Sequence, residues 1–318
     1  MPSDVHIREV LPKDAIPSID DPVFGSDHFG NDDDDVAVVE GSQARAYPLR
    51  ILDYHEIVND EIDGRPIAVT WCPLCGSAVV FDRTVDDMVL TFGVSGKLAD
   101  DDLVMYDRET GAEWKQSLGE CIAGEFEGTS LTVIPAAIVP YGVFKETHPD
   151  GVVLQPTGTL SEAASDDDTP APIEYDRRPY ERYFAAEGFG LSAHRGEPDQ
   201  RTWSRDDIEP KEVVLGIELG GEAVGYPMAQ VNAAGGVVVD SVGGHELIVV
   251  ASEDGLHAFE YPGGEVHLEG NTLVVDGTYF HPATGRGTDG KELARIPAIR
   301  LFAFSWQDDH GADAFYFA

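Results

Sequence analysis

The sequence predicts a mainly β protein, a β-rich α+β fold made of two tandem, diverged copies of one small module joined by a long connection. The first observation is that short runs of valine, isoleucine and aromatic residues alternate with Gly and Asp turns, which is typical of strands. The second is that four short motifs of the N-terminal half return in the C-terminal half. The third is length, because 318 residues can bury two cores of ordinary size.

The repeat consists of four pairs of segments that keep their order along the chain. The pairs are residues 45–49 with 224–228, 64–69 with 244–249, 105–111 with 279–285, and 134–136 with 296–298. Each pair is weak alone, but four collinear pairs indicate a duplication. We therefore divide the chain into an N-terminal arm that packs on the first module (1–35), the first module (36–155), an acidic and aromatic connection (156–209) and a degenerate second module (210–318).

Strands dominate both predicted modules. They are expected at residues 67–71, 78–82 and 89–94 of the first module and at 247–251 and 272–276 of the second. One short helix is expected at residues 49–58, after Pro48, because its apolar residues recur near helical spacing. In the connection, residues 165–172 are linker-like, whereas an aromatic cluster is expected to pack back on a module: Tyr175, Tyr180, Tyr183 and Phe184.

The chain is strongly acidic. Its 21 Lys and Arg residues against 59 Asp and Glu residues give a formal net charge of −38, so nucleic acid is excluded as a partner. A hydrophobic content of 42% indicates a folded protein, not a disordered polyanion. The scarcity of lysine resembles cytoplasmic proteins of extreme halophiles and predicts unfolding at low salt.

The N-terminal residues and the length of the apolar runs indicate where in the cell the protein is expected. Residues 1–4 have neither the basic nor the apolar region of a secretory signal. No apolar run approaches the ~20 residues that span a bilayer. We therefore expect a soluble, cytoplasmic protein without a membrane span.

The chemistry is expected at Cys72-Pro73-Leu74-Cys75, which follows the strand at residues 67–71. Both thiols then lie at a strand end and can chelate one metal ion or close a small disulfide ring. Three cysteines are too few for a disulfide framework. In the aligned second module, Cys72 corresponds to Ser252 and Cys75 to Gly255, so the thiols distinguish the first copy from the second.

The leading hypothesis is a zinc or copper site formed by Cys72, Cys75 and His55, because thiolate and imidazole suit these ions. Met105, as a soft copper ligand, Cys121 and His148 are less favoured ligands.

Two alternatives remain open. The same cysteines could be the catalytic residues of a thiol–disulfide oxidoreductase, although residues 76–81 predict a strand where a thioredoxin-type site has a helix. The protein could instead be a non-catalytic binding or scaffold module, in which scarce cations hold a small anionic ligand. The candidate ligand-binding residues are Ser95, Lys97, Asp107 and Arg108.

Several segments carry a resemblance to a known family, most clearly within residues 1–155. They are residues 13–17, 46–52, 55–60, 71–77, 95–98 and 105–108. They resemble the bacterial and archaeal family known as domain of unknown function thirty-one seventy-nine, which has a Trp/Tyr-Cys-Pro-x-Cys signature. The acidic composition suggests a member from a halophilic archaeon. The resemblance implies no established activity.

Overall fold

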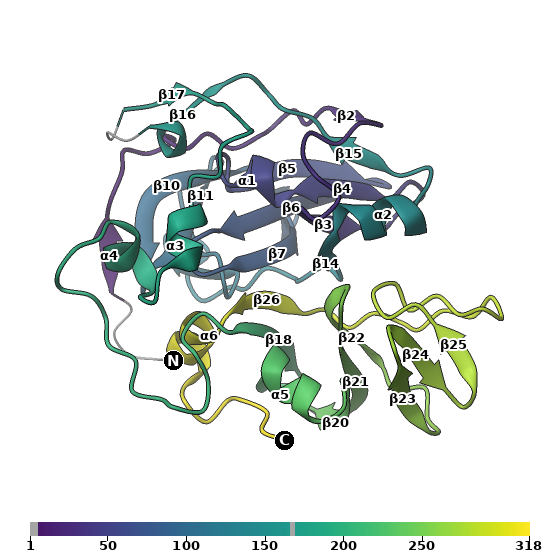
Figure 1. Ribbon diagram of the computed structural model, residues 1–318. Coiled ribbons are helices and arrows are strands. Elements are labelled where there is room, and N and C mark those ends of the chain that lie inside the picture. Colours follow the sequence, from purple (N-terminus) through teal and green to yellow (C-terminus); the bar gives the residue numbers. More distant parts are fainter. Residues whose placement is uncertain (1–5, 166–168) are drawn as a thin grey trace.

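The structure is a computed structural model that describes residues 6–165 and 169–318, and it is mainly β, as predicted (Figure 1). The first residues of the arm, 1–5, and residues 166–168 of the linker-like segment lie outside the described residues. Helices are short. They are α1 (Leu49–Leu52), α2 (Tyr141–Thr147), the 3-10 turn η1 (Glu162–Ala164), α3 (Glu181–Ala185), α4 (Gly190–His194), α5 (Met228–Ala233) and α6 (Ala303–His310). None of the described helices has the length and apolar character that a bilayer crossing requires.

Three larger sheets form the body of the molecule. The six-stranded sheet has the order β19 (Glu222–Pro227), β18 (Val213–Leu219), β26 (Ile299–Phe302), β7 (Ser77–Asp82), β6 (Arg65–Cys72) and β5 (Ile57–Ile62). One five-stranded sheet has the order β1 (Ile7–Glu9), β10 (Phe92–Ala99), β11 (Asp102–Asp107), β12 (Glu113–Lys115) and β13 (Glu120–Ala123). The other has the order β14 (Ala137–Pro140), β3 (Asp35–Val39), β4 (Arg45–Pro48), β15 (Val152–Leu154) and β2 (Phe24–Gly25).

Four smaller sheets complete the fold. Two have three strands: β20 (Val237–Val242), β21 (His245–Ser252) and β22 (Gly255–Glu260), then β23 (Val266–Glu269), β24 (Thr272–Val275) and β25 (Thr278–Phe280). Two are hairpins: β8 (Thr84–Val85) with β9 (Met88–Val89), and β16 (Leu160–Ser161) with β17 (Ala171–Pro172).

Most predicted strands are confirmed, but the predicted helix at residues 49–58 is too long. It ends at Leu52, and β5 begins at Ile57. Glu56 has a φ of 57°, in the left-handed region that interrupts a helix. Residues 57–62 then pair with β6, since a buried segment in a sheet gains a full ladder of hydrogen bonds. The predicted strand at 89–94 is also divided, between β9 and β10.

The two halves of the chain follow the same order of elements. The order strand, strand, short helix and three antiparallel strands describes β3 to β7 and, again, β18 to β22. A buried tyrosine before each short helix makes the same bond: Tyr47 Oη donates to Asp60 at 2.6 Å, and Tyr226 Oη donates to Asp240 at 2.9 Å. A duplication predicts such parallels. The common origin of the two halves and the module boundaries remain predictions.

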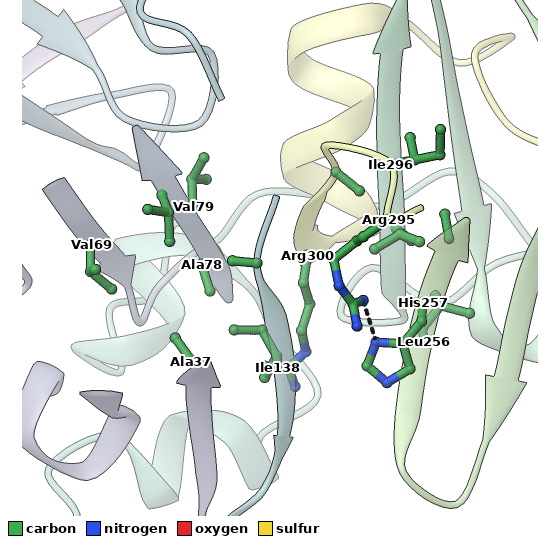
Figure 2. A pocket seen from close by; sticks show the side chains of 15 residues that line it. Ala37, Val69, Ala78, Val79, Ile138, Leu256, His257, Arg295, Ile296 and Arg300 are labelled. Atoms are coloured by element: carbon green, nitrogen blue, oxygen red, sulfur yellow. Dashed lines mark hydrogen bonds between the residues drawn. The ribbon is translucent and has the colours of Figure 1, made fainter. Parts of the chain in front are cut away.

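The halves are joined through their strands. Strand β26 pairs with β18 of its own half and meets β7 of the other through Arg300 and Ala78, while β14 lies beside β22. A small cavity between the two halves is lined by apolar side chains of both halves and by His257, Arg295 and Arg300 (Figure 2). Arg295 Nη1 points to His257 Nδ1 at 3.4 Å. The halves therefore share a continuous sheet across their boundary.

The connection packs on the first half. Tyr175, Tyr180 and Tyr183 are buried, as expected, whereas Phe184 is 42% exposed. Tyr183 Oη donates a hydrogen bond of 2.5 Å to the carbonyl oxygen of Leu74. The N–H of Leu191, in α4, donates to the Asp101 carboxylate at 3.2 Å. The connection is therefore anchored next to the Cys-Pro-Leu-Cys turn.

Candidate metal centre

The β6–β7 hairpin positions both thiols. Cys72 is the last residue of β6 and pairs with Ser77, so residues 73–76 form the connecting loop. Gly76 has a φ of 58°, and a Cβ there would lie 2.8 Å from the ring of Phe302, so glycine is required. The carbonyl oxygen of Cys75 accepts a hydrogen bond of 2.8 Å from the N–H of Phe302. A strand of the C-terminal half thus holds the loop of the N-terminal half.

Asp102 joins the two thiols. It begins β11, on the neighbouring sheet, and its carboxylate and both sulfur atoms lie within 4.8 Å of one another. All three side chains are buried, and the three cysteines of the chain are free. The Ser117 N–H donates to Asp102 Oδ2 at 2.7 Å and fixes the carboxylate. In the described ranges, no other group of three Cys, His, Asp or Glu side chains converges in this way.

Burial favours the protonated, uncharged forms of these three groups in the absence of an ion. It raises the pKa of Cys72, and it raises that of Cys75 well above its usual value. It also raises the pKa of Asp102 to about 6, although the charge of Lys115 opposes that shift. A metal cation can replace such protons and supply the missing positive charge.

A cleft of about 1250 Å³ opens beside this group; we call it the thiol cleft. Cys72, Leu74, Glu56 and Tyr180 are among its lining residues, whereas Cys75 and Asp102 are not. Burial, followed by the nearby carboxylates, raises the pKa of Glu56 to about 8. Cys72 is therefore the member of the group that faces the cleft, and a protonated carboxyl group accompanies it there at neutral pH.

His55 does not converge with the thiols. Its Nδ1 donates to the carbonyl oxygen of Pro17 at 2.8 Å, so Nε2 accepts from the hydroxyl of Tyr175 at 2.7 Å. Burial lowers the pKa of His55 to about 4. Both ring nitrogens are therefore occupied, Nδ1 by the N-terminal arm and Nε2 by the connection.

Cys121 and His148 are outside the group formed by the two thiols and Asp102, and Met105 packs in the core. Met105 is a fully buried β11 residue opposite Trp114. Cys121, in β13, directs its sulfur to the carbonyl oxygen of Ala123 at 3.4 Å. His148, after α2, has Nδ1 2.9 Å from Thr147 Oγ1 and Nε2 3.6 Å from Glu40.

Of the expected anion-binding residues, Lys97 alone lines the thiol cleft. It is paired with Glu113 at 2.7 Å. Ser95 Oγ donates to the carbonyl oxygen of Val104 at 2.5 Å. Asp107 accepts a hydrogen bond of 3.0 Å from Trp114 Nε1 and organises the turn that follows it.

Arg108 binds the N-terminal arm instead. Its guanidinium lies 3.5 Å from the carboxylate of Asp14 and 3.3 Å from that of Asp20. These pairs attach the arm to the β11–β12 turn and leave Arg108 away from the thiols.

The sequence did not indicate Asp102 or Glu56 as site residues, and Tyr180 was expected only to pack on a module. One carboxylate among 59 acidic residues carries no signal of its own in the sequence. Only the pairing of β10 with β11 brings Asp102 to the hairpin loop.

A family model described as protein of unknown function (DUF3179) matches residues 13–313, which include both halves and the connection. No curated protein and no solved structure shows significant similarity to the chain.

Proposed function

The chain belongs to the DUF3179 family, whose description states no function, and we propose from its site that it binds one transition-metal ion through Cys72, Cys75 and Asp102. The observation that supports this function is the convergence of two thiols and a buried carboxylate within 4.8 Å. Asp102 takes the place that the sequence analysis assigned to His55. His55 stays a less supported ligand because both of its ring nitrogens have other partners.

The ligand set favours zinc over copper. Two thiolates suit either ion, but a carboxylate oxygen is a common zinc ligand, whereas Cu(I) prefers soft sulfur ligands. Three protein ligands leave one tetrahedral position of zinc open, as in catalytic zinc sites. Since Cys72 faces the thiol cleft, that position would be reached from the cleft. A bound ion there would polarise a ligand or activate water, and Glu56 could donate a proton to the same molecule.

Elemental analysis tests the metal site. Protein purified without chelator or metal-affinity tag should contain one zinc ion per chain, or take up one on titration. Cys72→Ser and Cys75→Ser should lose the ion, and Asp102→Asn should bind it at least about tenfold more weakly. Cys121→Ser is the matched control, because Cys121 is equally buried but outside the group. Absence of stoichiometric zinc, copper or iron, with no uptake on titration, would contradict the proposal.

A thiol–disulfide oxidoreductase is the second candidate function. It is favoured by the order of the thiols, since Cys72 lines the cleft and Cys75 is packed behind it. The Cys72 thiolate would attack a substrate disulfide, and Cys75 would then displace the reduced substrate and leave a Cys72–Cys75 disulfide. The raised pKa of both thiols and the strand after Gly76 count against this function. A pair that stays reduced under mild oxidants would rule it out.

A non-catalytic binding module is the third candidate. It requires that a ligand bind the first half without the thiols. Cys72→Ser with unchanged ligand affinity and no loss of activity in any assay would favour it.

A further inference from the structure

The thiol cleft has an unusual charge for this protein. Six of the 21 basic residues of the chain line it, but only four of the 59 acidic residues do so. Elsewhere the chain is overwhelmingly acidic, so its surface repels other polyanions. A cationic cleft within an acidic surface attracts a small anion, which can enter the cleft. A nucleic acid or an acidic protein is attracted less, because it would also contact the acidic surface around the cleft.

Three of these six cations come from one segment of the connection. We call residues 177–182, with the sequence Arg-Arg-Pro-Tyr-Glu-Arg, the arginine strap. Its Tyr180 is buried and is one of the residues that line the cleft. The three arginines of the strap line the same cleft as Cys72, so the strap adds guanidinium groups to the cleft that this thiol faces.

The positive charge is incompletely neutralised. Arg50 and Arg178 share one carboxylate, that of Asp34, at 2.8 and 3.3 Å. Arg182 and Arg195, which are exposed and line the same cleft, form no ion pair with any residue in the described ranges. Guanidinium groups bind carboxylate and phosphate oxygens through strong paired hydrogen bonds. The cleft thus has free donors for an anionic group.

We propose that the thiol cleft binds a small organic anion bearing a carboxylate or phosphate group. Arg178, Arg182 and Arg195 hold the charged group, and the rest of the molecule extends toward Cys72 and Glu56. The cleft, at about 1250 Å³, is large enough for such a molecule. This anion would be the ligand of the proposed metal site and so deepens the proposed function. Only the position of the anion relative to the metal rests on that function.

Calorimetric titration of the full chain tests the anion site. Inorganic phosphate and malonate serve as separate probes, at constant ionic strength maintained with KCl. At least one should bind saturably at one site per chain, and the one that binds identifies the charged group. The double variant Arg182→Gln/Arg195→Gln should bind it at least about tenfold more weakly, since each guanidinium contributes charge-assisted hydrogen bonds.

A second double variant controls for net charge. Lys145→Gln/Lys291→Gln removes the same number of charges from exposed positions outside the cleft and should retain the affinity of the wild type. The inference is overturned if neither probe binds saturably, or if the two double variants weaken binding equally. Circular dichroism should show that both double variants keep the wild-type fold.

Failure of the metal site is distinguishable from failure of the anion site. Cys72→Ser/Cys75→Ser should lose the metal but keep the anion affinity measured for metal-free wild-type protein. Arg182→Gln/Arg195→Gln should keep the metal. Loss of anion binding in the cysteine variant, with its fold intact, would contradict an anion site formed by the arginines.

Discussion

Two hairpins of the molecule, β6–β7 and β21–β22, share their strands and differ in their loops. In both, a strand of eight residues is followed by one of six. The first closes at Cys72 and Ser77 around four residues, whereas the second closes at Ser252 and Gly255 around two. The structural counterpart of Gly255 is therefore Ser77, and the alignment of Gly255 with Cys75 was wrong. The hairpin that carries the dithiol therefore has a loop two residues longer than the hairpin that lacks it.

The comparison extends beyond the loops. The Tyr–Asp bond and the antiparallel ladders occur in both halves, as support for the fold. The first half adds buried carboxyl groups, and burial raises the pKa of Asp53 to about 6 and that of Glu56 to about 8. Burying such groups costs stability, so their presence in one half is typical of a functional site.

The largest predicted effect comes from exchanging the loops. Replacing residues 73–77 by the tripeptide Glu-Asp-Gly of the second hairpin should keep the ladder, because that turn, which ends at Gly255 with a φ of 119°, already connects equivalent strands. The variant lacks Cys75, so stoichiometric metal binding should be lost completely. Elemental analysis and circular dichroism measure the two outcomes. Retention of one tightly bound ion would show that the loop is not the metal site.

The next effect concerns one buried histidine in each half. Burial lowers the pKa of His55 to about 4 and that of His257 to about 3. Between these values and about 6.5 the unfolded chain binds more protons, so each histidine makes the free energy of unfolding fall as pH falls, by up to about 1.4 kcal/mol per pH unit.

Urea unfolding between pH 7 and 4 checks this dependence. His55→Gln and His257→Gln should each reduce the slope by a similar amount, and the double variant by the sum. An unchanged slope in one variant would show that the halves differ in acid sensitivity.

A smaller effect is expected from the bond that both halves share. Tyr47→Phe and Tyr226→Phe should each lower the free energy of unfolding by about 1.5 to 3 kcal/mol, because each hydroxyl donates to a carboxylate. Chemical denaturation of the two variants measures the costs. A cost in only one half would break the structural equivalence.

The smallest effect is expected at the turns before β6 and β21. Gly64 and Gly244 both have a φ of 80°, and a Cβ on either would meet no atom within 4 Å. Gly64→Ala and Gly244→Ala should therefore cost only backbone strain, about 1 kcal/mol each. Thermal unfolding measures both. Gly76→Ala, where a Cβ would also meet Phe302, should cost more than either.

Local patterns allowed part of this structure to be predicted. Apolar runs predicted β6, β7, β21 and β24, and the spacing of Cys72 and Cys75 placed two thiols at a strand end. The helix after Pro48 was predicted too long because its periodicity continues into β5, where pairing with β6 overrides helical preference.

The sequence by itself determined the class of fold, the acidic character and the location of the dithiol, because these depend on composition and on residues close together in the chain. Tertiary structure alone decided that Asp102 joins the thiols in place of His55, that Arg108 binds the arm, and that residues of the connection line the thiol cleft. These contacts join residues about 30 to more than 100 positions apart in the chain. Strand pairing and core packing bring such residues together, and neither leaves a local pattern in the sequence.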